Sequence, residues 1–172
     1  GTDDPGVEGV ATFGLDESIY PGGVVVIDTD NCDRGAIIGD NMMTSMVRRG
    51  AVGFIVDGGI RDYQEFIDTD TPVFCRYASP VNAHKYWHFT EFETPITLKG
   101  IWGDITVSPG DLILADADGI SVIPLQDAEQ IIADAEIHQA TENSIKNALL
   151  KNSDRQSITA ASKRLQHVKP FT

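Results

Sequence analysis

The chain has 172 residues, of which 41% are hydrophobic and 23% are charged, the balance of a globular domain that can bury a core. Its net charge of −13 argues against a nucleic-acid partner. No apolar run reaches the roughly 18 residues that a membrane span needs, so no membrane partner is expected. Neither Cys32 nor Cys75 has a zinc-type spacing, which indicates a reducing, cytoplasmic setting.

The first part of the chain alternates loops with short apolar runs. Residues 1–8 are acidic and contain glycine and proline, so they predict a loose end. Residues 9–13 predict a short strand. The run Val-Val-Val-Ile at residues 24–27 predicts a buried strand, and residues 30–35 predict a polar loop after it.

A helix is predicted next, at residues 42–49. Asp40 and Asn41 precede it, and either side chain can cap the free amides of a first helical turn. Gly50 follows it, as glycine often does at the C-terminal end of a helix. We expect Met43 and Val47 on its buried face.

The most informative stretch runs from residue 53 to residue 65. Residues 54–56, Phe-Ile-Val, form an apolar run too short for a helix and typical of a strand that is covered on both faces. The pair Gly58-Gly59 predicts a turn in which the backbone approaches a ligand closely. Arg61 and Asp62 follow where a helix begins, and α/β proteins place their chemistry at such junctions.

The second half of the chain predicts a strand, a long loop, a series of strands and then helices. The loop at residues 76–93 is rich in aromatic side chains and histidine, and such long loops are often functional or interfacial. The strands on either side are expected at residues 71–75, 96–98, 101–107, 112–115 and 120–123.

Helical spacing dominates residues 125–172, and a capping box at residues 153–156 predicts the start of a last helix. Its apolar face is expected at Ile158, Ala161, Leu165 and Val168. Downstream of Asn143 six basic residues face a single acid, Asp154. We interpret this basic tail as a surface or subunit-docking helix rather than as a nucleic-acid arm. We therefore predict a single α/β domain over residues 1–172.

Two predicted helix starts are separated by one helix and one strand. If their strands are parallel, both starts lie at one edge of the sheet. The free amides and positive dipole end of a helix suit a carboxylate or phosphate, and Arg61 adds a fork of donors for an oxyanion. Asp62 and Glu65 add hard oxygen ligands of the kind that Mg²⁺ or Mn²⁺ takes. The alternative, equally weighted from spacing alone, is an Arg-Asp pair that closes a turn beside a solvated Glu65.

A family resemblance favours the chemical interpretation. Asp40, twenty intervening residues, Arg61-Asp62, two residues and Glu65 resemble the signature of the RraA-like family, which includes class II pyruvate aldolases acting on 4-hydroxy-4-methyl-2-oxoglutarate. The ordered landmarks that share this resemblance are Arg49-Gly50, Gly53, Asp57-Gly58-Gly59, Pro72-Val73-Phe74, Pro109-Gly110-Asp111 and the run from Ala115 to Pro124.

The resemblance implies a β/β/α swivelling-domain fold with C-terminal helices, assembled as a homotrimer or as a hexamer of two trimers. It implies that Asp62 binds Mg²⁺ or Mn²⁺, with waters completing the coordination and Glu65 further out. Arg61 would contact the keto oxygen of a small 2-oxo acid and stabilise its enolate. The amides of Asn41 and Met42 would hold the carboxylate.

By the same resemblance, Asp40 would orient a water that shuttles a proton. The implied reaction is retro-aldol cleavage to pyruvate and a keto acid, and the same enolate chemistry would decarboxylate oxaloacetate.

Two alternatives stay open. Some RraA-like proteins regulate ribonuclease E, but these tend to lack the second acidic position that Glu65 occupies here. The second alternative is a related metal-enolate lyase that acts on another substrate. The stretch at residues 84–91 does not resemble the usual family loop, and we expect it to serve packing or an interface rather than the distal half of the substrate pocket.

Overall fold

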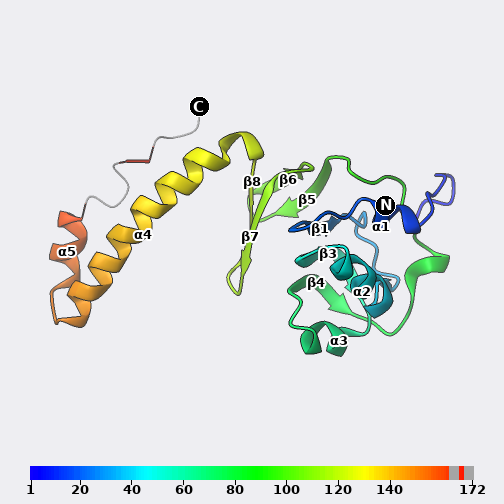
Figure 1. Cartoon of the computed structure of the whole chain (residues 1–172), viewed down its shortest axis with the longest axis horizontal. Coiled ribbons are helices and arrows are strands. Elements are labelled where there is room, and N and C mark those ends of the chain that lie inside the picture. The colour runs from blue at the N-terminus through cyan, green and yellow to red at the C-terminus, as the bar shows by residue number, and fades with distance from the viewer. Residues whose placement is uncertain (163–166, 169–172) are drawn as a thin grey trace. The chain divides into compact units, whose positions relative to one another are not determined.

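A computed structural model describes residues 1–162 and 167–168 and shows an α/β protein, as predicted (Figure 1). The chain forms two compact units, Gly1–Pro109 and Gly110–Thr172. In the part of the chain that the structure describes, no helix is both long and apolar enough to cross a membrane.

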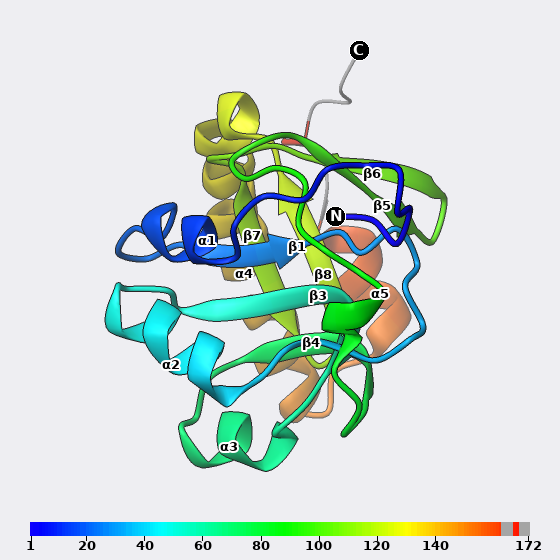
Figure 2. The same ribbon diagram turned by 90° about the vertical axis from the view of Figure 1, so that its right-hand side faces the viewer.

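The first unit is built on a parallel sheet with β3 (Gly53–Ile60) as its central strand (Figure 2). β1 (Val24–Ile27) pairs with the first half of β3, and β2 (Ala36–Ile38) pairs with its last residues. β4 (Val73–Ala78) pairs with both halves of β3. Because β3 is paired and covered, seven of its eight residues are buried, which confirms the strand predicted at residues 54–56.

The other elements of this unit are short. They are α1 (Phe13–Glu17), α2 (Asp40–Arg48), α3 (Tyr63–Asp68), the 3₁₀ turn η1 (Ala83–Lys85) and the antiparallel hairpin of β5 (Ile96–Gly100) and β6 (Gly103–Val107). The core packs α2 and α3 against the sheet. Its fully buried side chains include Met43, Met46, Phe54 and Phe66, and the rings of Phe54 and Phe66 meet edge to face at 5.9 Å.

Two predictions about the strands and turns of this unit are wrong, and one strand was missed. Residues 9–13 form no strand, and α1 begins at Phe13 instead. β2 was not predicted, because three buried residues are too few to show a period. The pair Gly58-Gly59 forms no turn but continues β3 without a positive φ.

Those two glycines are required by close packing. A Cβ on Gly58 would lie 2.8 Å from Thr29 Cγ2, and one on Gly59 would lie 2.5 Å from the ring of Tyr77. The adjacent strands and loop can therefore approach β3 only where it has no side chain.

The helix α2 confirms the prediction at residues 42–49 but begins two residues earlier, at Asp40. Its N-cap is Gly39, so neither Asp40 nor Asn41 caps it. At the other end Gly50 has φ +112°, and the amides of Gly50 and Ala51 donate to the carbonyls of Val47 and Met46. This is a Schellman ending, as expected from the glycine. Val47, predicted on the buried face, is 36% exposed, while Met43 is buried as expected.

Residues 1–8, predicted to be a loose end, and the residues between them and α1 are hydrogen-bonded to the aromatic stretch within residues 76–93, called the aromatic loop below. Thr2 pairs with His88 in an antiparallel bridge, and the amide of Val10 donates to the carbonyl of Phe89. The imidazole of His88 is 2.8 Å from the carbonyl oxygen of Val7.

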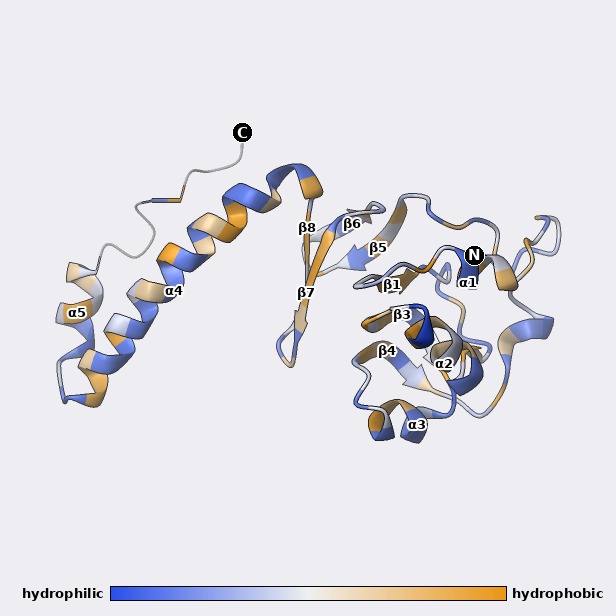
Figure 3. Ribbon diagram, viewed as in Figure 1, coloured by the Kyte–Doolittle hydropathy of each residue, from blue (hydrophilic) through white to orange (hydrophobic). Residues whose placement is uncertain are grey.

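The second unit contains an antiparallel hairpin and helices. β7 (Leu112–Asp116) pairs with β8 (Gly119–Ile123), and the 3₁₀ turn η2 (Leu125–Asp127) leads into α4 (Ala128–Leu150). Apolar and polar residues are interspersed along α4 (Figure 3). The last described helix, α5 (Arg155–Ala161), is capped by Asp154 rather than by the first residue of the predicted box. Leu165, expected on its apolar face, lies outside the described residues.

Candidate active site

The two predicted helix starts lie side by side at the carboxyl edge of the sheet. β2 and β3 run parallel, so the residues that follow them emerge at the same edge. The amide of Arg61 donates to the carbonyl of Ile38 at 3.0 Å. The amide of Asp40 donates to Asp62 Oδ2 at 3.2 Å. These two hydrogen bonds join the start of α2 to the start of α3.

Gly39 allows this close approach. Its backbone is extended, with φ −144°, a conformation that any residue can adopt. A Cβ at this position, however, would lie 2.4 Å from Arg61 Nε and 2.7 Å from Asp62 Oδ2. A glycine is therefore required here for the space that the Arg61-Asp62 pair occupies.

Asp62 is held in an unusual conformation. It is the N-cap of α3 with φ 57° and ψ 39°, the left-handed region, and its side chain does not cap its own helix. The carboxylate instead faces the start of α2, where Oδ2 also lies 3.4 Å from Arg61 Nε. Aspartate tolerates this conformation better than most residues, but strained backbone of this kind concentrates at functional sites.

The remaining predicted residues lie nearby on the two helices. Asp40, Asn41 and Met42 are the first three residues of α2. Glu65 lies in the first turn of α3 and is exposed. Within the described ranges no hydrogen bond or ion pair joins Glu65 to Arg61. The structure brings together Arg61, Asp62 and the start of α2 and leaves Glu65 at the periphery.

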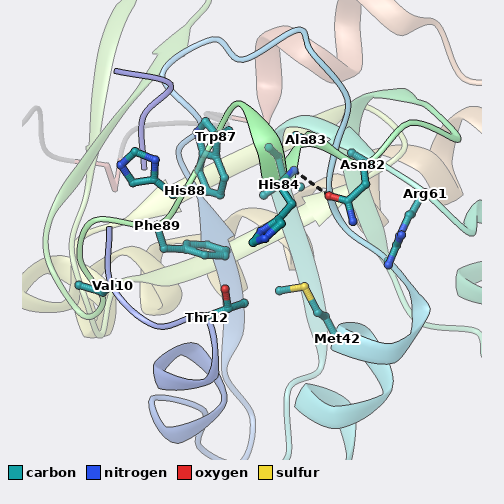
Figure 4. A pocket seen from close by; sticks show the side chains of 13 residues that line it. Val10, Thr12, Met42, Arg61, Asn82, Ala83, His84, Trp87, His88 and Phe89 are labelled. Atoms are coloured by element: carbon teal, nitrogen blue, oxygen red, sulfur yellow. Dashed lines mark hydrogen bonds between the residues drawn. The ribbon is translucent and has the colours of Figure 1, made fainter. Parts of the chain in front are cut away.

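A pocket of about 190 Å³ opens beside this pair (Figure 4). Arg61, Gly39 and Met42 form one part of its wall, and the loop after β4 forms another. The other lining residues are Val10, Thr12, Ala36, Ile37, Asn82, Ala83, His84, Trp87, His88 and Phe89.

The aromatic loop packs into the core, as predicted, and also lines this pocket. Trp87 and Phe89 are 4% and 7% exposed and belong to the hydrophobic core, and the indole of Trp87 donates to the carbonyl of Thr29 at 2.9 Å. Both rings also line the pocket. Packing was the predicted role, and the pocket is the role that the sequence prediction ranked lower.

Sequence reasoning missed Thr12 and Asn82 as pocket residues, and it ranked a pocket role for His84 below packing or an interface. Thr12 precedes a helix that was not predicted, and Asn82 and His84 belong to a loop without a recognised pattern. The one available signal was the histidine-rich, aromatic composition of that loop, which indicates a role but not a position.

The site fits a divalent cation held by one carboxylate and waters. Asp62 is 39% exposed, and no hydrogen-bond partner contacts its Oδ1 in the described part of the chain. No three His, Cys, Asp or Glu side chains cluster as a cage among the described residues. Mg²⁺ suits such a site, because it keeps several waters and takes one or two carboxylates.

Comparison with known proteins places the chain in a family. The model of the RraA-like family, described as Aldolase/RraA, matches residues 13–122. The chain is 35% identical over 132 residues to a putative 4-hydroxy-4-methyl-2-oxoglutarate aldolase of Halalkalibacterium halodurans, covering 77% of this chain and 60% of that protein. It thus spans less than two thirds of that relative's length.

Two solved structures share the fold. An uncharacterized protein from Pseudomonas syringae pv. tomato superposes with a TM-score of 0.79 at 24% identity, covering 91% of this chain and 80% of that one, which shows the fold alone. RraAS2 of Streptomyces coelicolor, described as an unusual member of the RNase ES inhibitor RraA protein family, has a TM-score of 0.68 at 29% identity, covering 77% and 66%. Since the family model matches more than half of the sequence, the chain belongs to the RraA-like family.

Proposed function

We propose that this protein is a divalent-metal-dependent class II pyruvate aldolase that cleaves a 4-hydroxy-2-oxo acid to pyruvate and a keto acid. The observation that carries the proposal is the junction of the two helix starts, where the amide of Asp40 binds Asp62 beside Arg61. The name of the Halalkalibacterium relative supports the same reaction class.

In the proposed reaction the bond between C3 and C4 of the substrate breaks. The 4-hydroxyl loses its proton and becomes a carbonyl, and the bonding electrons pass through C3 and C2 to the keto oxygen, giving the enolate of pyruvate. Arg61 lines the pocket, and its guanidinium would stabilise that oxyanion. Asp40 would orient a water that takes the hydroxyl proton and returns one to C3.

The start of α2 would bind the other end of the pyruvyl group. α2 has no side-chain cap, so the amides of Asn41 and Met42 can donate to a carboxylate. Asp62 would hold Mg²⁺ or Mn²⁺, with Glu65 further out, and the cation would supply Lewis-acid polarisation of the keto group. The same residues would decarboxylate oxaloacetate, because loss of CO₂ also leaves the enolate of pyruvate.

The proposal includes the assembly. We expect a homotrimer or a hexamer of two trimers in the cytoplasm, acting on a small 2-oxo acid and not on nucleic acid or membranes. Light scattering at micromolar concentration checks this expectation, and a monomer there would contradict it.

A protein regulator of ribonuclease E is the second candidate. The likeness to RraAS2 favours it, whereas Glu65 at the second acidic position favours an enzyme. A related lyase with another substrate is the third. Addition of the chain to a ribonuclease E cleavage assay separates the regulator from both enzymes.

The main experiment measures pyruvate release from 4-hydroxy-4-methyl-2-oxoglutarate and from oxaloacetate. We expect release with Mg²⁺ or Mn²⁺, loss of it with a chelator, and its return when the metal is restored. No pyruvate from either substrate under any metal condition would exclude the aldolase and the decarboxylase together.

A further inference from the structure

The turn at residues 82–85 is fixed beside the proposed active site. The amide of Ala36 donates to the carbonyl of Val81 at 2.7 Å, and Ala36 forms a parallel bridge with Asn82. Gly35 has φ +147°, and a Cβ there would lie 2.6 Å from the carbonyl oxygen of Val81. The turn is therefore attached to β2 a few residues before Gly39, and its position depends on the strand that leads into the site.

A tyrosine strengthens this attachment. The hydroxyl of Tyr77 donates to the carbonyls of Cys32 at 3.0 Å and Gly35 at 3.2 Å. Burial raises the pKa of Tyr77, so the hydroxyl stays protonated and remains a donor. The strand that precedes the turn and the loop that precedes β2 are thus bonded to each other.

The lining of the pocket differs in composition from the acidic chain as a whole. The protein carries a net charge of −13, yet no aspartate or glutamate is among the residues that line the pocket, and Arg61 is. The lining also includes the hydroxyl of Thr12 and the side chains of Asn82 and His84. Such a wall offers hydrogen-bond donors without acidic groups, which suits an anion.

Asn82 presents a donor to this pocket. Its Oδ1 accepts a hydrogen bond from the amide of His84 at 2.7 Å and so caps the 3₁₀ turn. Because the oxygen is used in this way, the NH₂ group of the same side chain is left to donate to a ligand. Figure 4 shows this nitrogen pointing away from the capping bond.

The two histidines of the pocket differ. The imidazole of His88 is engaged with the carbonyl of Val7 at 2.8 Å. The imidazole of His84 has no hydrogen-bond partner in residues 1–162 and 167–168, and Figure 4 shows its ring directed into the pocket. His84 is therefore the histidine that can bind a ligand.

We propose that Asn82 and His84 determine substrate specificity by binding a carboxylate on the distal half of the substrate while Arg61 binds the pyruvyl half. This inference rests on the proposed function. It assigns a role to a loop that does not resemble the family pattern, and it predicts that a 4-hydroxy-2-oxo acid without the distal carboxylate is a poorer substrate.

The test compares two reactions of each variant. Exchange of the pyruvate methyl protons with D₂O, followed by NMR, needs only the pyruvyl half. Cleavage of 4-hydroxy-4-methyl-2-oxoglutarate needs both halves. For His84→Ala we expect exchange within about twofold of wild type and a kcat/KM for cleavage lower by about 10–100-fold, mostly through KM, because a hydrogen bond to a charged group is lost.

Asn82→Asp is the second variant. Its carboxylate can still accept the hydrogen bond from the amide of His84 and preserve the turn. Because it replaces a donor with a negative charge, kcat/KM for cleavage should fall at least as much as in His84→Ala. Lys85→Ala is the matched control, since Lys85 lies in the same turn and is not among the lining residues. It should change neither reaction.

The outcomes are distinct. Wild-type protein that catalyses neither exchange nor cleavage removes the proposed function and this inference with it. Wild-type protein that catalyses both, with both variants cleaving at the wild-type kcat/KM, overturns the inference alone. Equal loss of exchange and cleavage in both variants also overturns it, because the two residues would then serve the reacting half or the fold.

Discussion

The first turns of α2 and α5 differ in how their free backbone amides are satisfied. Both expose backbone amides that lack partners within the helix. At α5, Asp154 accepts from the amide of Ser157 at 2.8 Å and closes the end with its own side chain. At α2, the N-cap is Gly39, which has no side chain, and only the amide of Asp40 is bound by the remote Asp62.

This difference between the two first turns indicates where a ligand can bind. In α5 the side chain of Asp154 already occupies an amide of the first turn. In α2 no side chain of the helix does so, and its first amides stay available beside a pocket that Arg61 lines. Gly39 is also the residue whose small size lets Arg61 and Asp62 approach. One glycine thus leaves the amides open and makes room for the charged pair.

The largest effect should come from removing the guanidinium group of Arg61. Arg61→Ala is expected to lower kcat/KM for pyruvate release by about 10²–10³-fold, the usual cost of losing one oxyanion-stabilising donor. Circular dichroism should show an intact fold, because Arg61 is partly exposed. Arg48→Ala, at the exposed C-terminal end of α2 and away from the pocket lining, is the control. Near-normal kcat in Arg61→Ala would remove Arg61 from the mechanism.

Replacing the carboxylate without disturbing the backbone should have the next largest effect. Asn tolerates the left-handed region as Asp does, so Asp62→Asn should fold normally. We expect its Mg²⁺ affinity, measured by calorimetry, to fall by more than about 100-fold, since losing even an outlying partner of a metal site costs 10–100-fold. Unchanged affinity would place the metal elsewhere.

A smaller effect should come from filling the space at the start of α2. Gly39→Ala introduces a Cβ that overlaps Arg61 Nε but causes no backbone strain at φ −144°. Displacement of the arginine should lower kcat/KM by about 10–100-fold with little change in the unfolding midpoint. Gly53→Ala is the control, because its Cβ would lie 3.4 Å from the carbonyl oxygen and 3.7 Å from the Cβ of Pro72, which are ordinary van der Waals distances. A fully active Gly39→Ala variant would show that catalysis tolerates displacement of the Arg61 side chain.

The smallest effect is expected at the helix that caps itself. The hydrogen bonds from Ser157 lower the pKa of Asp154. The cap therefore contributes stability above the ordinary pKa of an aspartate and loses it as the pH falls through the lowered value. In Asp154→Ala the amide of Ser157 should exchange with solvent faster at neutral pH, and pyruvate release should not change. Equal exchange rates in both proteins would show that the cap is not formed in solution.

The helix starts and the central strand could be predicted from the sequence for local reasons. The run at residues 54–56 is apolar without a polar break, Gly50 supplies a helix end, and the spacing from Asp40 to Arg61-Asp62 carries the family resemblance. Each of these signals depends on residues close together in the chain or on a fixed interval.

The details of the same region could not be predicted, because they depend on neighbours from other strands. Gly58 and Gly59 predict a turn locally, yet they extend β3, since Thr29 and Tyr77 pack against it. Asp40 has the side chain of a capping residue but is the first helical residue, and its amide is bound by Asp62 at the start of another helix. β2 has too few residues for a pattern and forms by pairing with β3.

By itself, then, the sequence determined the α/β class and the family, and it directed attention to Arg61 and Asp62, because periodicity and spacing are properties of the chain alone. Only the tertiary structure decided that the two helix starts meet, that Gly39 must be small, and that the aromatic loop brings Asn82 and His84 into the same pocket as Arg61. The physical reason is that parallel pairing of β2 and β3 joins residues far apart in the chain, and no local pattern records such contacts.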